Sequence, residues 1–283
     1  MTPAAIIDYL CGVAPHDTEG RSLQMIACRD RVRDPDDLLR GQHRSGAWSA
    51  GPDEGPENCY HTALALIALR SMASDDHMPP AVARAFNWLD SMVGVENHWL
   101  WKWKFRYFDR HVRFDTNTTG WPWVEGTVSW VAPTSMVMLA HRAWHRNSAR
   151  LAIAEAMLLD RACAEGGWNA GNSEVFGVPL DPHPDFTAMA LLALNSRSSE
   201  LSPIVARSLD YLPDRLATSE SLYSLAWAAL ALTAWRHAGG QLVAQRLHDR
   251  LAMTIPTAVP VHTLALAILA TEVPPFSFVG GMP

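Results

Sequence analysis

The sequence predicts an all-α protein folded as an α/α toroid, in which about 10–12 helices form two concentric rings. Short helices that are apolar nearly all round alternate along the chain with helices of ordinary amphipathic pattern. A helix without a polar face must be enclosed on every side, so the apolar helices are expected inside and the amphipathic helices outside. With 283 residues, 48% hydrophobic and 18% charged, the chain can bury a large core, and its composition excludes disorder and a coiled coil.

The inner helices are expected in five similar segments rich in alanine and leucine. These segments are headed by Thr62, Thr134, Thr187, Leu225 and Thr263. The last three heads are 38 residues apart, the length of one helix pair with its turns. Amphipathic outer helices are predicted at 79–93, 148–163, 201–216 and 239–253. Because these repeats follow one another along the chain, we expect a single toroid domain spanning residues 1–283.

Residues 96–131 form a tryptophan-rich insertion that departs from the helical period. Between His98 and Phe108, aromatic residues alternate with Lys102, Lys104 and Arg106. This period of two is typical of a strand, and the run 112–114 is expected to pair with it as a short β-hairpin. We expect the insertion to cap one mouth of the toroid.

Charge and hydropathy restrict the partners. The net charge of −6 offers no basic footprint for nucleic acid. The longest apolar runs, 222–235 and 261–270, are too short to span a bilayer, so no integral membrane segment and at most a weak membrane association are expected. The first residues lack the pattern of a secretory signal, which favours the cytoplasm, and four separated cysteines do not suggest a disulfide framework.

Three loops before inner helices share glycine and tryptophan. They are Gly46-Ala47-Trp48, Gly120-Trp121-Pro122-Trp123 and Gly166-Gly167-Trp168-Asn169. Glycine permits the turn, and tryptophan can wedge between helix pairs while its N–H bonds a backbone carbonyl. Over residues 40–270 this pattern resembles the repeats of the prenyltransferase and squalene-cyclase family. The resemblance implies an α/α barrel whose aromatic-lined central cavity accepts an isoprenoid or similar lipid, with no cofactor required.

The resemblance also points to a catalytic acid. Class II terpene cyclases protonate an alkene or epoxide with the middle Asp of an Asp-x-Asp-Asp-Thr-Ala motif. The matching stretch, residues 183–188, retains the middle residue as Asp185 and has His183 and Phe186 in place of the flanking carboxylates. Asp185 is therefore the candidate acid for a proton-initiated cyclisation. The alternative is a non-catalytic lipid-binding or interaction protein that kept the toroid and lost the motif.

A metal site is not predicted from the family pattern. Protein prenyltransferases hold zinc with an Asp, a Cys two residues later and a distant His on a Tyr-His-Thr segment. Residues 60–62 match that segment, but the chain has no Asp-x-Cys. A different ligand set remains open, with His61, Asp185 and His262 at the starts of inner helices around one rim and His183 and Glu57 nearby.

Further residues are expected at the cavity or its mouth. The predicted cavity and substrate-binding residues are His61, Trp99, Trp101, Trp103, Trp123, Glu125, Trp130, His183 and His262. Glu125 among indoles would have a raised pKa and could contact a polar head group, or it is a solvated loop residue. Arg106, Arg110, His111 and Arg113 form a basic patch that suits a diphosphate, or a solvated hairpin face. Asp53, Glu54 and Glu57 form an acidic loop that suits a cation or merely solvates a turn.

Overall fold

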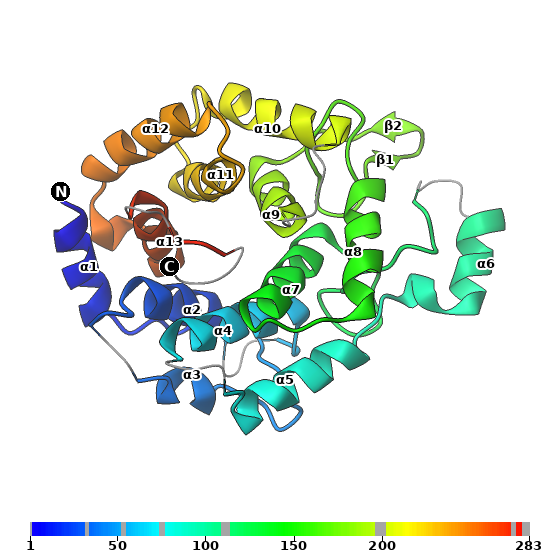
Figure 1. The fold of residues 1–283 in the computed structure, drawn as a ribbon, viewed down its shortest axis with the longest axis horizontal. Coiled ribbons are helices and arrows are strands. Elements are labelled where there is room, and N and C mark those ends of the chain that lie inside the picture. Colours follow the sequence, from blue (N-terminus) through cyan, green and yellow to red (C-terminus); the bar gives the residue numbers. More distant parts are fainter. Residues whose placement is uncertain are drawn as a thin grey trace.

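The chain folds into thirteen α-helices and one two-stranded sheet in the part that the structure describes. The computed structural model describes residues 2–31, 34–51, 55–73, 77–108, 114–195, 202–272 and 276–278. The prediction of a mostly helical protein is confirmed, with one helix more than the expected upper number. In Figure 1 the helices labelled α2, α4, α7, α9, α11 and α13 lie around a common centre, and most of the others lie outside them.

The six inner helices contact one another in cyclic order. They are α2 (Thr18–Ala27), α4 (Cys59–Met72), α7 (Val131–Ala143), α9 (Pro184–Leu194), α11 (Leu222–Ala234) and α13 (Val261–Thr271). Each packs on the next, and α13 packs on α2, so the sequence of contacts returns to its start. The five inner segments predicted from the sequence are therefore all helices, and α2 is a sixth that the sequence reading missed.

The outer helices pack each on an inner neighbour. They are α1 (Pro3–Gly12), α3 (Asp36–Arg40), α5 (Pro80–Ser91), α8 (Ala149–Asp160), α10 (Pro203–Leu216) and α12 (Gly240–Ala252). The predicted outer ranges match α5, α8, α10 and α12 to within three residues. Helix α4 shows the difference between the two sets, because ten of its eleven residues from Cys59 to Leu69, all except His61, are buried. The core thus lies between and within the inner helices.

In each of the three glycine-tryptophan loops, one tryptophan anchors the loop to the outer helix before it, as the sequence predicted. Trp48, Trp121 and Trp168 are at most 1% exposed. Their indole N–H groups donate to the carbonyl oxygens of Leu38, Leu89 and Leu158 at 2.6–2.8 Å. Their backbone N–H groups donate to the hydroxyls of Thr62, Thr134 and Thr187 at 2.9–3.0 Å. The glycine-tryptophan loops and the threonines that follow them are therefore one repeated structural unit.

The prediction of a strand in the insertion is wrong. Residues 99–107 form helix α6 (Trp99–Tyr107), preceded by the short turn η1 (Val95–Asn97). A strand here would need a partner to satisfy its backbone, whereas a helix satisfies the backbone locally, and tryptophan, lysine and leucine tolerate helical geometry. The hairpin expectation for 112–114 falls largely outside the described residues. In Figure 1, α6 lies at the outer edge of the molecule, beyond α8 and away from the centre of the ring.

The two-stranded sheet lies instead in the loop before α9. Strands β1 (Glu174–Val175) and β2 (Val178–Pro179) pair antiparallel. Phe176 and Gly177 between them both have positive φ, 54° and 76°, as a two-residue hairpin turn requires. Among the described residues, no helix has the length and apolar character needed to cross a bilayer.

Candidate functional site

The amino-terminal ends of the inner helices meet at one end of the molecule. Glu19 is the second residue of α2, Tyr60 of α4 and Tyr223 of α11. The hydroxyls of Tyr60 and Tyr223 donate to the same carboxylate oxygen, Glu19 Oε1, at 2.9 and 3.1 Å. Helices α4 and α11 are not neighbours in the cycle of contacts, so this carboxylate joins opposite sides of the ring across its middle. We call the set of residues at these helix starts the polar rim.

Burial keeps the two tyrosines protonated. It raises the pKa of Tyr60 well above its ordinary value, and the nearby Glu19 raises that pKa further. It also raises the pKa of Tyr223. Both hydroxyls therefore remain donors at neutral pH, while Glu19 lies in the first turn of α2, where the helix dipole favours a negative charge. The rim thus holds one carboxylate between two neutral phenols.

Asp185 lies on the same rim, as the second residue of α9. Burial raises the pKa of its carboxyl group, while a hydrogen bond with the Ser224 side chain of α11 and the nearby His183 act in the opposite direction. One oxygen, Oδ1, is buried and finds no hydrogen-bond partner among the described residues. Burial of a carboxylate oxygen that lacks a hydrogen-bond partner destabilises the charged form, which is the direction in which the pKa of Asp185 is shifted.

The two predicted histidines of the inner helices lie near the tyrosines. His61 follows Tyr60 on α4, and its Nδ1 lies 2.9 Å from Asn58 Oδ1. Burial lowers the pKa of His61 to about 4, against the opposing charge of Asp17. His262, at the start of α13, packs edge-on against the Tyr223 ring at 5.8 Å. His61 is therefore neutral at physiological pH.

Trp123, a residue of the insertion, contacts the rim. Its ring lies 5.1 Å from that of Tyr60, and its carbonyl accepts a hydrogen bond from Cys59 at the start of α4. The expected cap is therefore represented at the rim by Trp123, whereas capping by the whole insertion stays a prediction.

Aromatic side chains pack together in the interior behind the rim. Trp227 on α11 is fully buried and packs against Phe278 with ring centroids 5.3 Å apart. Phe278 is 2% exposed and also contacts Phe276, whose N–H donates to the Leu269 carbonyl near the end of α13. Residues 276–278 thus lie on the side of the ring opposite the rim, next to the carboxy-terminal end of α13. A surface pocket of about 500 Å³ lies on the outer side of the molecule, lined by Glu165 and charged residues of α10.

Of the remaining predicted residues, His183 and Trp130 lie at the starts of the inner helices α9 and α7, whereas the tryptophans of α6 do not lie at the start of an inner helix. His183 is exposed and packs on the Phe186 ring, Glu125 is exposed, and Trp130 is half-buried at the start of α7. Trp99, Trp101 and Trp103 are on α6, with 69%, 38% and 53% of their surface exposed. Nothing is described of the Arg106 side chain, and Asp53, Glu54, Arg110, His111 and Arg113 lie outside the described residues.

The alternative metal site is not formed by the described residues. No group of three or more His, Cys, Asp or Glu side chains in that part of the chain is placed to hold a metal ion. Glu57 accepts instead from Ser45, at 2.8 Å, and lies 3.6 Å from His43.

Sequence reasoning missed Glu19, Tyr223 and Ser224. A usable signal exists, because Glu19, Tyr60, Asp185, Tyr223 and His262 are each the second residue of an inner helix. Aligning helix starts rather than apolar runs would have collected them.

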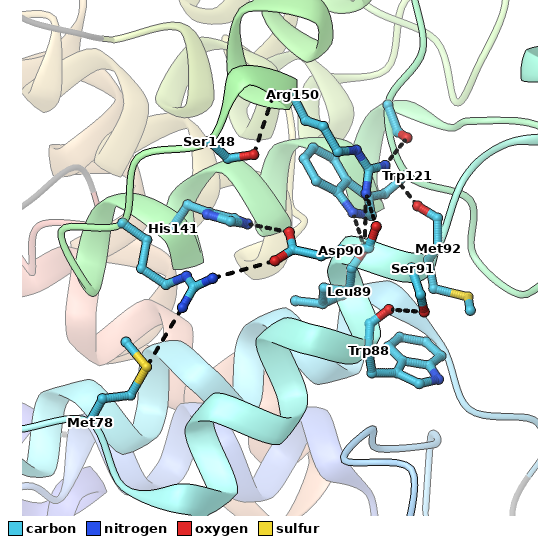
Figure 2. A network of polar contacts seen from close by, with 12 residues as sticks. Met78, Trp88, Leu89, Asp90, Ser91, Met92, Trp121, His141, Ser148 and Arg150 are labelled. Carbon is cyan, nitrogen blue, oxygen red and sulfur yellow. Dashed lines mark hydrogen bonds and ion pairs between the residues drawn. The ribbon is translucent and has the colours of Figure 1, made fainter.

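A second buried polar network lies between α5 and α7 (Figure 2). His141 on α7 is fully buried, with Nε2 3.9 Å from Asp90 Oδ1 on α5. Arg146 pairs with the same carboxylate at 3.3 Å. Neither ring nitrogen of His141 has a hydrogen-bond partner among the described residues. Burial lowers the pKa of His141 to about 4, with Asp90 raising it and Arg146 and Arg150 lowering it.

The fold and the rim define a mostly helical, cyclically packed domain, and similar solved structures exist. The native conformation of E. coli alpha-2-macroglobulin matches 95% of this chain at 11% identity, with a TM-score of 0.51. Salmonella alpha-2-macroglobulin reacted with methylamine also matches 95% of the chain, at 12% identity and a TM-score of 0.52.

These similarities concern the fold alone. The chain spans only 16% and 17% of the length of those two proteins. No protein-family model matches the chain, so the resemblance to prenyltransferase and squalene-cyclase repeats depends on its own motifs. No curated protein matches it either.

Proposed function

We propose that the chain is an α/α toroid that binds an isoprenoid or similar apolar molecule at the polar rim and protonates it with Asp185. The proposal depends chiefly on one observation, the buried Oδ1 of Asp185 that has no hydrogen-bond partner among the described residues. A carboxyl group whose pKa is raised by burial, and which has an unused oxygen, is suited to give a proton to an alkene. The cyclic order of inner-helix contacts and the glycine-tryptophan loops support the toroid.

The rim supplies further groups for such a reaction. The ring faces of Tyr60, Trp123 and Tyr223 would stabilise a carbocation through their electron-rich π faces. Because Trp227 and Phe278 pack together inside the ring, our proposal puts the reacting double bond at the rim and not deep within the ring. The Glu19 carboxylate, held between two phenols, would favour a positive charge nearby.

The test is turnover of apolar substrates. Purified protein is incubated with farnesyl diphosphate, geranylgeranyl diphosphate or squalene, and products are separated by gas chromatography with mass detection. Asp185→Asn should reduce turnover by about 10²-fold or more, because the amide gives up no proton. Asp181→Asn, at an exposed position in the loop before α9, is the matched control and should retain turnover. Equal rates in wild type and Asp185→Asn would refute the role of Asp185.

The second candidate is a non-catalytic lipid-binding or interaction protein. It is favoured by the packing of Phe278 on Trp227, which leaves side chains where a long substrate would lie. It is also favoured by His183 and Phe186 in place of acidic residues. Saturable binding of the same compounds without products would support the lipid-binding form of this candidate. Absence of both binding and turnover would refute catalysis and lipid binding, and would leave only the interaction protein.

A further inference from the structure

Helix α6 carries a row of exposed aromatic side chains. Trp99, Trp103 and Tyr107 are spaced by four residues, so they lie on one face of the helix. Their exposed fractions are 69%, 53% and 58%, and those of the adjacent Leu100 and Phe108 are 49% and 65%. The rings of Trp103 and Phe108 are 4.7 Å apart, so the row is continuous. We call these five residues the aromatic face.

A different face of α6 attaches the helix to the rest of the molecule. Phe105 packs on Phe114 with ring centroids 5.0 Å apart, and Trp101 packs on Phe105 at 5.8 Å. The helix also contacts η1, which precedes it. The aromatic face is therefore not the face that packs against Phe114, and its exposure requires another explanation.

Exposed tryptophan on this scale is unlike the rest of the chain. The three loop tryptophans and Trp227 are at most 1% exposed, whereas Trp99 and Trp103 have more than half of their surface in contact with water. A concentrated apolar patch on a projecting element marks a site of interaction.

Charge identifies the kind of partner. Residues 98–114 contain five lysines and arginines against one aspartate, in a chain whose net charge is −6. On α6 itself, Lys102 and Lys104 lie on either side of the row of Trp99, Trp103 and Tyr107 by helical spacing. Lys104 Nζ lies 4.5 Å from the centre of the Trp101 ring. A positive element in a negative chain is complementary to an anionic surface.

We propose that α6 binds the surface of an anionic lipid bilayer, lying parallel to the membrane plane. The aromatic face would enter the boundary between head groups and acyl chains, where tryptophan and tyrosine place an apolar ring in lipid and a polar group in water. Lys102 and Lys104 would reach the phosphates on either side. With nine residues, the helix is much too short to cross the membrane. The proposal is independent of catalysis at Asp185.

Flotation with vesicles tests the proposal. Full-length protein is mixed with vesicles of phosphatidylcholine alone, or containing about 30% phosphatidylglycerol, and the bound fraction is measured against lipid concentration. Wild type should bind the anionic vesicles, and the binding should weaken as salt is added. Trp99→Ala/Trp103→Ala should lower the partition coefficient by at least about tenfold. Lys102→Gln/Lys104→Gln should lower it by about tenfold on anionic vesicles and little on neutral ones.

The matched control removes exposed apolar surface elsewhere. Met253 and Ile255, just after α12, are 69% and 67% exposed, and α12 lies across the ring from α6 in Figure 1. Met253→Ala/Ile255→Ala should bind as wild type does. Circular dichroism and thermal unfolding show whether each variant is folded, because only folded variants enter the comparison.

Three results would overturn the proposal. They are failure of wild type to bind anionic vesicles, equal binding by wild type and Trp99→Ala/Trp103→Ala, and equal binding to neutral and anionic vesicles. Dimers of wild type that dissociate in the tryptophan variant, without vesicle binding, would assign the aromatic face to a second copy of the chain instead.

Discussion

Replacement of His141 should make the protein less sensitive to acid. This side chain is fully buried between Phe86 and Trp121, and burial lowers its pKa from 6.5 to about 4. A histidine whose pKa is lower in the folded state stabilises the fold above its unfolded pKa. That stabilisation is lost as pH falls from about 6.5 towards 4, because the unfolded chain takes up the proton first.

The size of the effect follows from the pKa difference. Between pH 7 and pH 4 the wild type should lose about 3 kcal/mol of unfolding free energy through this group alone. His141→Leu lacks the titrating ring and should not show this loss. The variant can be less stable than wild type at pH 7, yet the difference should shrink or reverse at pH 4.

Urea unfolding followed by circular dichroism at several pH values measures the difference. His248→Gln, at an exposed position on α12, removes one histidine without altering the core and is the matched control. If the stability of His141→Leu falls between pH 7 and pH 4 as steeply as that of wild type, the buried neutral imidazole is not the source of acid sensitivity and the reasoning is refuted.

Three further predictions concern other buried groups. Asp185→Asn should gain stability relative to wild type as pH rises above about 4, because the raised pKa of Asp185 means that its ionised form destabilises the folded state. Thermal unfolding of both proteins at acid and neutral pH measures this difference. If the two melting temperatures change with pH in parallel, the prediction is contradicted. Trp168→Phe removes the 2.6 Å bond to the buried Leu158 carbonyl and should cost about 1–3 kcal/mol in urea unfolding, and a negligible loss would mean that water replaces the indole. The sulfurs of Cys11 and Cys28 lie 2.8 Å apart, so oxidised glutathione should take two hydrogen atoms from them to form one intramolecular disulfide. Intact-mass analysis without reductant detects that loss, and Cys11→Ser should abolish it; a mixed disulfide that persists at Cys11 would contradict the expected pairing.

The sequence predicted those elements whose burial pattern is uniform. Residues 59–72 and 222–234 are apolar on all sides, and both are inner helices. The glycine-tryptophan loops were predictable because each repeats one local hydrogen-bond arrangement. Helix α2 was not predicted as an inner helix because its polar residues have partners inside the molecule. Gln24 donates to the Val13 carbonyl at 2.6 Å, and Glu19 accepts from two tyrosines. Polar residues with buried partners resemble a solvated face when only the sequence is read.

The strand prediction for residues 98–108 was wrong for a different reason. Alternating tryptophan and lysine satisfies a period of two, but Trp99, Trp103 and Tyr107 also satisfy a spacing of four. Periodicity alone does not choose between these arrangements when few of the residues are buried. The rim was partly predictable, since His61, Asp185 and His262 lie at starts of inner helices. Its central contact, between Glu19 and the two tyrosines, joins residues up to 204 positions apart and has no local signature.

The packing of α13 on α2 bears on how the molecule is synthesised and folded. A row of stacked helix pairs with free ends can begin to fold at any unit and grow outward. Here α2 has one of its two inner neighbours, α4, early in synthesis, while the other is made more than 230 residues later. Arg29 and Glu272, 2.8 Å apart, close the same junction.

In the emerging chain, the side of α2 that packs on α13 therefore stays uncovered until α13 leaves the ribosome. Such late closure raises the entropic barrier to folding and exposes apolar surface to chaperones or to other nascent chains. Once formed, the junction couples the first and last inner helices, so local opening at either end of the chain weakens both. A circularly permuted chain that joins α13 directly to α2 would form this junction locally, and the late closure would move to the junction at which the chain is opened.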